Sequence, residues 1–137
     1  MKYFTILLVS FLALNACKNS NTNPDSSNAE PPSGTYTINT LPEHNNISQE
    51  LTITFDEATK KVSGHSGCNQ FFGTYNVNGT SLTFSQMGST RKMCDPNANA
   101  LETAMLQSLN QINTYTIKDN VLQLKVDNKT FIQAVKN

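Results

Sequence analysis

Apolar and polar residues alternate over short stretches between residues 34 and 137, and a period of two is typical of half-buried β-strands. Leu51, Ile53 and Phe55, for example, alternate with polar neighbours. The same pattern recurs at Tyr75, Val77, Leu82, Phe84, Leu122, Leu124, Val126 and Phe131. Turn residues separate these stretches at 56–60, 78–79, 119–120 and 127–129. Asn78-Gly79 is the strongest hairpin signal, and the whole pattern predicts a meander of antiparallel strands.

One segment has helical periodicity instead. Asp95 is a good helix cap and Pro96 suits the first helical position. Apolar residues then recur at helical intervals, at Ala98, Leu101, Met105, Leu109 and Ile112. This predicts one amphipathic helix from Pro96 to Gln111 that closes over the sheet, with its apolar stripe in the core. The predicted fold class is therefore α+β, and mostly β.

The N-terminus has the pattern of a processing segment. Residues 1–16 contain a basic start and an apolar stretch too short to span a bilayer comfortably, which predicts a secretory signal. Leu14-Asn15-Ala16-Cys17 resembles the bacterial lipobox, in which the cysteine is acylated with groups such as palmitate after cleavage. A single-pass anchor and an ordinary cleaved signal are the alternatives. Polar residues follow, so we expect 17–33 to be the lipidated Cys17 and a flexible linker.

Residues 34–137 then suffice for one domain with one core. The ten acidic and ten basic side chains of the chain give a formal net charge of zero. A neutral chain without a basic patch has no electrostatic attraction for nucleic acid, so we expect no nucleic-acid partner.

Cys68 and Cys94 remain once Cys17 is assigned to lipid, and in an exported protein they favour a structural disulfide. A redox or nucleophilic cysteine is the alternative, because His65 lies three residues before Cys68. Metal binding is weakly supported, since His44 and His65 form no recognisable ligand spacing with both cysteines. We expect no metal, no cofactor and no catalytic residue.

The residues around these cysteines supply the candidate binding motif. Arg91 is the chain's single arginine, and it could clamp an anion near Asn69 and Thr90, although we favour a salt bridge or hydrogen bonds that order the turn. Asn69 is more typical of a residue that satisfies backbone groups. Phe71 and Phe72 cannot both face inward on a regular strand. Either one is exposed as a partner contact, or a bulge at Gly73 turns both inward.

These motifs resemble a known family. The runs 67–75 and 89–94, the strand at 82–84, the following helix and Tyr115 are similar to the META domain of the HslJ heat-shock lipoprotein family. The resemblance covers 34–135 and implies a small antiparallel β-barrel-like or half-barrel sheet with one helix packed over it. The family often has a tryptophan in its first strand, where this chain offers Tyr36 for the same core position.

The resemblance also implies a function class, because no enzymatic activity is established for such domains. We therefore expect a non-enzymatic cell-envelope lipoprotein that binds a protein partner or an acyl chain, in envelope stress response or secretion. The alternative is a thiol-dependent redox protein or enzyme that uses Cys68 or Cys94. The residue after the acylated cysteine is Lys18, not the aspartate that is linked with inner-membrane retention in enteric bacteria. We therefore expect the protein to be located in the outer membrane.

Overall fold

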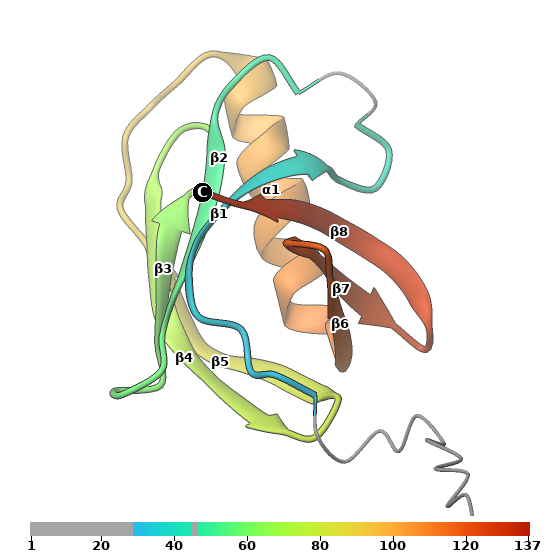
Figure 1. Cartoon of the computed structure of the whole chain (residues 1–137). Coiled ribbons are helices and arrows are strands. Elements are labelled where there is room, and N and C mark those ends of the chain that lie inside the picture. Colours follow the sequence, from blue (N-terminus) through green and yellow to red (C-terminus); the bar gives the residue numbers. More distant parts are fainter. Residues whose placement is uncertain (1–28, 45–46) are drawn as a thin grey trace, which may run out of the picture.

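The computed structural model describes residues 29–44 and 47–137, and within them it contains eight strands and one helix (Figure 1). The elements are β1 (Gly34–Thr40), β2 (Leu51–Asp56), β3 (Lys61–His65), β4 (Gln70–Asn78), β5 (Ser81–Ser89), α1 (Pro96–Gln111), β6 (Thr114–Lys118), β7 (Val121–Val126) and β8 (Lys129–Lys136). The predicted signal peptide, the lipidated Cys17 and most of the linker lie outside the described residues.

Every strand pairs antiparallel with its neighbour in the chain, and β1 pairs with β8, so the sheet closes into a ring. The junctions are unequal. β1 and β8 pair from Tyr36–Lys136 to Thr40–Gln133, whereas β5 and β6 pair at Ser81–Thr114 alone. The predicted small, mostly β, barrel-like sheet with one helix is confirmed, with one wide opening between β5 and β6.

Helix α1 connects β5 to β6 and packs against β5 at this opening (Figure 1). It begins where predicted, because the Asp95 carboxylate accepts hydrogen bonds from the backbone N–H groups of Asn97 (3.0 Å) and Ala98 (3.1 Å). Its buried residues are Ala98, Leu101, Met105, Ser108 and Leu109. The predicted apolar stripe therefore packs in the core, with Ser108 as a polar member.

Inward-facing side chains fill the ring. Tyr36, Phe55 and Tyr75 stack edge to face, with ring centroids 6.0 and 5.1 Å apart along the series. Tyr36 is buried in the core, as expected for the family's tryptophan position. Burial raises the pKa of the hydroxyl groups of Tyr36, Tyr75 and Tyr115 above the usual value. The interior is thus a packed core, as eight strands allow.

The segment before β1 already contacts the domain. Ala29 packs against the core cluster, Pro32 is buried, and the Tyr115 hydroxyl donates to the carbonyl oxygen of Glu30 at 3.1 Å. The last residues of the expected 17–33 linker therefore pack on the domain, because Ala29, Pro31 and Pro32 bring apolar surface close together there.

Candidate functional site

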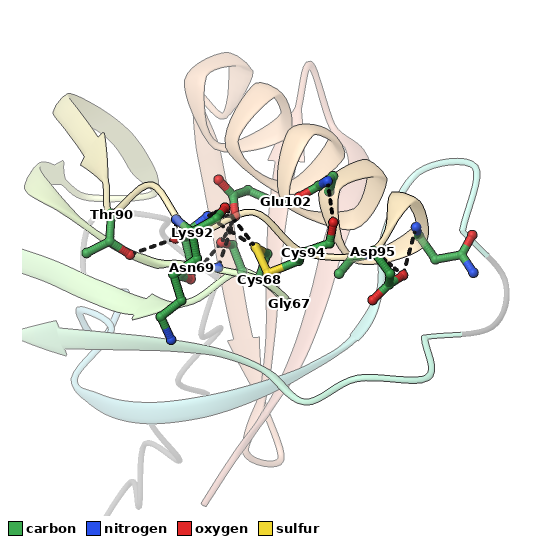
Figure 2. Close-up of a disulfide and its surroundings, with 12 residues drawn as sticks. Gly67, Cys68, Asn69, Thr90, Lys92, Cys94, Asp95 and Glu102 are labelled. Carbon is green, nitrogen blue, oxygen red and sulfur yellow. Dashed lines mark hydrogen bonds between the residues drawn. A yellow bond between two sulfur atoms is a disulfide. The ribbon is translucent and has the colours of Figure 1, made fainter.

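The structure joins Cys68, in the loop between β3 and β4, to Cys94, just before α1 (Figure 2). Their Cα atoms are 5.9 Å apart across a sequence separation of 26. The predicted disulfide therefore ties the β3–β4 loop to the start of the helix. We call Ser66–Asn69, Thr90, Lys92, Cys94 and Glu102 together the disulfide corner.

Asn69 is the hydrogen-bonding centre of this corner, and it is buried. Its side-chain oxygen accepts from the Thr90 hydroxyl at 2.9 Å and from the Lys92 backbone N–H at 2.7 Å. Its amide nitrogen donates to Glu102 Oε2 at 2.9 Å and to the Lys92 carbonyl at 3.4 Å (Figure 2). Both lone pairs and both protons of the amide are used. Asn69 therefore satisfies neighbouring groups, as the sequence favoured.

Glu102 was not singled out in the sequence. Oε2 of this residue, on the second turn of α1, also accepts from the Asn69 backbone N–H at 3.0 Å and from the Ser66 hydroxyl at 3.3 Å. The carboxylate thereby ties α1 to the β3–β4 loop beside the disulfide. No local pattern identifies it, because a glutamate on the polar side of an amphipathic helix is ordinarily a solvated residue.

The β3–β4 loop is also closed by its own backbone. The Ser66 N–H and hydroxyl both donate to the Asn69 carbonyl, at 2.9 and 2.8 Å. Gly67 adopts φ +98°, and a Cβ there would lie 3.0 Å from Gln49 Oε1 and 3.2 Å from Leu51 Cδ2. A larger residue is therefore disfavoured at this position both by conformation and by space.

Phe71 and Phe72 lie in opposite environments. Phe71 is fully buried, whereas the Phe72 side chain is 55% exposed. The hypothesis that a bulge at Gly73 turns both rings inward is wrong, because the strand keeps its alternation. The irregularity is a shift in the pairing of β4 with β5. Phe72 pairs with Gly88 and Thr74 pairs with Ser85, so two steps along β4 correspond to three steps along β5. The extra residue belongs to β5, where Gln86 has φ 53°.

Phe72 lies over the neighbouring strand between two surface depressions. A Cβ on Gly88 would lie 2.9 Å from Phe72 Cε2, so the missing side chain leaves room for the ring. One depression, of about 540 Å³, extends over β2 and β3 and includes Asp56 and Lys61. The other, of about 350 Å³, is lined by Phe72, Met87, Gly88, Ser89, Arg91, Leu106 and Asn110. We call this second depression the edge groove, and both depressions with Phe72 the Phe72 surface.

Arg91 lines the edge groove and is exposed. Within the described part of the chain, the hydrogen bonds that order its segment run through its neighbours Thr90 and Lys92 to Asn69. This differs from the expectation that Arg91 orders the turn. Arg91 instead lines the edge groove together with the apolar residues Phe72, Met87 and Leu106.

His65 does not act on a cysteine thiol in this arrangement. Its Nδ1 accepts from the Gly67 N–H at 3.3 Å and lies 3.2 Å from the Glu50 carbonyl, while Cys68 is held in the disulfide. Residues 29–44 and 47–137 contain no cluster of three or more His, Cys, Asp or Glu suited to a metal ion. In the same described ranges, no helix is both long enough and apolar enough to span a membrane.

The solved structures include folds of the same kind. An NMR structure of a protein from Burkholderia xenovorans matches with a TM-score of 0.61 and 22% identity, over 84% of this chain and 97% of that one. A crystal structure of a DUF4847 family protein from Bacteroides vulgatus matches with a TM-score of 0.54 and 17% identity, over 77% of this chain and 93% of that one. At these identities the likeness establishes the fold alone. No curated protein matches the chain.

The family assignment has independent support from the sequence. The family model of the META domain matches residues 31–137, which include every strand, the helix and the whole disulfide corner. Its first matched residues include Pro32, which is buried just before β1. The chain therefore belongs to the META domain family.

Proposed function

We propose that this protein is a non-enzymatic lipoprotein of the cell envelope that binds a protein partner through the Phe72 surface. In this proposal, residues 1–16 direct export, the acylated Cys17 anchors the chain in the outer membrane, and the linker holds the domain near the lipid surface. The bound partner would act in envelope stress response or secretion, as the family resemblance implies.

The exposure of Phe72 is the observation that carries the proposal. An aromatic side chain that is 55% exposed has apolar surface left in water, and aromatic and arginine residues are enriched at the energetic centres of interfaces. Met87 and Arg91 lie beside it, and the nearby loop carries Met93, which is 96% exposed. Because the disulfide corner fixes the adjoining loops, this surface is presented with little ordering cost.

A protein partner fits this surface better than an acyl chain enclosed by the ring. The interior is occupied by buried side chains of the strands and the helix. The depressions beside Phe72 are open to solvent and carry polar rims, which include Asp56, Lys61 and Asn110. Mixed apolar and polar surfaces of this kind are typical of protein interfaces.

The binding surface can be tested in intact cells of the native host. A photoreactive phenylalanine analogue at position 72 should form a discrete crosslinked species with another protein after illumination. The same analogue at Val135, which is 40% exposed on β8, is the matched control and should not yield that species. Equal crosslinking at both positions, or none at either, would contradict the proposal.

The membrane anchor needs its own test. Radiolabelled palmitate should label the wild-type protein and not the Cys17→Ala variant, and only the wild type should fractionate with the outer membrane. Labelling that survives the substitution would exclude Cys17 as the acylated residue.

A further inference from the structure

A pocket lies where the pairing of β1 with β8 ends. The last pair of this ladder is Thr40–Gln133, although β8 itself begins earlier, at Lys129. Beyond Thr40 the chain closes into a turn, because the His44 N–H donates to the Leu41 carbonyl at 3.3 Å. The end of β1 therefore does not cover the first residues of β8, and space remains between the two segments and α1.

This space has the size of a small-molecule site. Its volume is about 520 Å³, and its walls are residues 40–43, residues 129–131 and the part of α1 from Ala104 to Gln111. Sites for small ligands have volumes of roughly 300–1,000 Å³. We call this space the helix pocket.

The floor of the helix pocket is mostly apolar. Leu41 and Ser108 are buried, and Ala104 and Phe131 are partly buried. Ser108 is the polar member among the buried residues of α1, so the floor also contains one hydroxyl-bearing side chain. Such a floor suits a ligand with an apolar side chain better than a ligand that is polar throughout.

The rim of the helix pocket carries both signs of charge. Glu43 and Lys129 are the two charged residues that line it, and both are exposed. Lys129 Nζ lies 5.8 Å from the centre of the Phe131 ring, which also lines the pocket. A carboxylate and an ammonium group each bind ligand groups of the opposite charge through strong hydrogen bonds. Charge complementarity therefore favours a ligand that carries both charges.

The backbone of Glu43 supports a role in binding. Glu43 follows Pro42 in the turn and has φ 64°, in the left-handed region that glycine and asparagine ordinarily occupy. Residues held in this region cluster at ligand sites, because the surrounding structure has to keep them there. The turn therefore keeps a carboxylate at the pocket in spite of an unfavourable conformation.

We infer that the helix pocket binds a small zwitterion, either an apolar α-amino acid or a short apolar peptide, with its ammonium group on Glu43 and its carboxylate on Lys129. The apolar side chain of the ligand packs on the floor beside Leu41. Amino acid and peptide share this chemistry, because each has one ammonium and one carboxylate end. The inference goes beyond the proposed function, since the helix pocket shares no residue with the Phe72 surface.

Amide NMR shifts of the full-length chain in detergent micelles can measure binding of leucine, leucyl-leucine, N-acetyl-leucine and leucinamide. N-acetyl-leucine lacks the ammonium group and leucinamide lacks the carboxylate. We expect leucine to bind about tenfold more tightly than either blocked form, as for the loss of a charged hydrogen bond. The shifts should appear at Leu41, Ser108 and Thr130 and not at Phe72. Tighter binding of leucyl-leucine than of leucine would assign the pocket to peptides, and the reverse order would assign it to free amino acids.

Charge variants then test each end of the ligand. Glu43→Gln should remove the preference for leucine over N-acetyl-leucine and keep the preference over leucinamide, and Lys129→Gln should do the opposite. Glu57→Gln and Lys118→Gln are the matched controls, because they change the same charges at exposed residues that do not line the pocket. Both controls should keep both preferences.

A larger side chain on the helix tests the location of the ligand. Ala104→Leu should weaken leucine binding at least tenfold by filling the pocket, while the helix tolerates leucine at a partly exposed position. Unchanged binding by this variant would overturn the inference. So would a failure of leucine and leucyl-leucine to bind at millimolar concentration, or equally tight binding of the blocked forms.

Discussion

The disulfide corner and the Phe72 surface meet where β4 begins and β5 ends, but they differ in how far their side chains are already paired or buried. In the corner, the Asn69 amide uses its full hydrogen-bonding capacity, and the disulfide joins loop to helix. On the surface, Phe72 remains half exposed, and Arg91 has no carboxylate partner within the edge groove. The disulfide corner is therefore a rigid platform, and the side chains that are free to bind a partner lie beside it.

The largest expected effect on stability comes from replacing one of the two adjacent phenylalanines with alanine. Phe71→Ala should lower the free energy of unfolding by about 3–5 kcal/mol, because it leaves a cavity in the core. Phe72→Ala should change it by less than about 1 kcal/mol and should abolish partner crosslinking from a photoreactive residue placed at Met87. Urea denaturation of both variants measures the difference. Similar losses would erase the distinction between platform and surface.

Removal of the disulfide is the next largest effect. The Cys68→Ser, Cys94→Ser double variant should lose about 3–4 kcal/mol of stability in the chain-entropy model, because the unfolded chain gains freedom. Wild-type protein with reductant is the comparison, measured by denaturation in the same buffer. If the double variant remains folded and crosslinks to its partner, the thiol-dependent alternative fails.

The polar network can be weakened without touching the disulfide. Asn69→Ala should cost about 2–3 kcal/mol, because Glu102 and the Lys92 N–H lose a buried partner. Thr90→Val removes one of the hydrogen bonds to Asn69 and should cost about 1 kcal/mol. Thermal unfolding ranks the two variants, and a larger loss for Thr90→Val would show that Asn69 is not the centre of the corner.

The smallest effect concerns pH and lies on the Phe72 surface. Asp56 accepts hydrogen bonds from Ala58 and Thr59 in the turn after β2, and the hydrogen bonds from Thr59 chiefly hold the pKa of its carboxyl below its ordinary value. A lowered pKa in the folded state gives stability that is present above about pH 4 and is lost as the pH falls further. Asp56→Asn should be less stable near neutrality and flatten this dependence, measured as melting temperature against pH. An unchanged profile would contradict the role of the carboxylate.

Much of the fold could be predicted because strand and helix periodicities are local. The alternation around Leu51–Phe55 and the cap at Asp95 both match the structure. The hairpin turn is shifted by one residue, since Asn78 pairs with Ser81 and the turn consists of Gly79 and Thr80. Closure of β1 on β8 came only from the family resemblance, because pairing between distant strands has no signature in a single sequence.

The candidate site was predictable only in part. Cys68, Cys94 and Asn69 carry recognisable chemistry, and their proximity follows from a disulfide. Glu102 was missed because its role depends on how α1 packs, which helical periodicity does not specify. The short pairing of β5 with β6 was also missed, because the alternation along β5 resembles that of its neighbours and does not show that α1 comes between the two strands.

Because β1 pairs with β8, the sheet cannot close until the last strand has been synthesised. The Thr37 hydroxyl donates to the side chain of Asn137, 100 positions away, at 2.8 Å, whereas both partners of the disulfide are made much earlier. Until the last strand has been made, β1 and β7 each expose an edge, and such edges promote aggregation. Loss of the final residues should therefore lower the yield of soluble protein by leaving an unfinished ring, even where the disulfide has already formed.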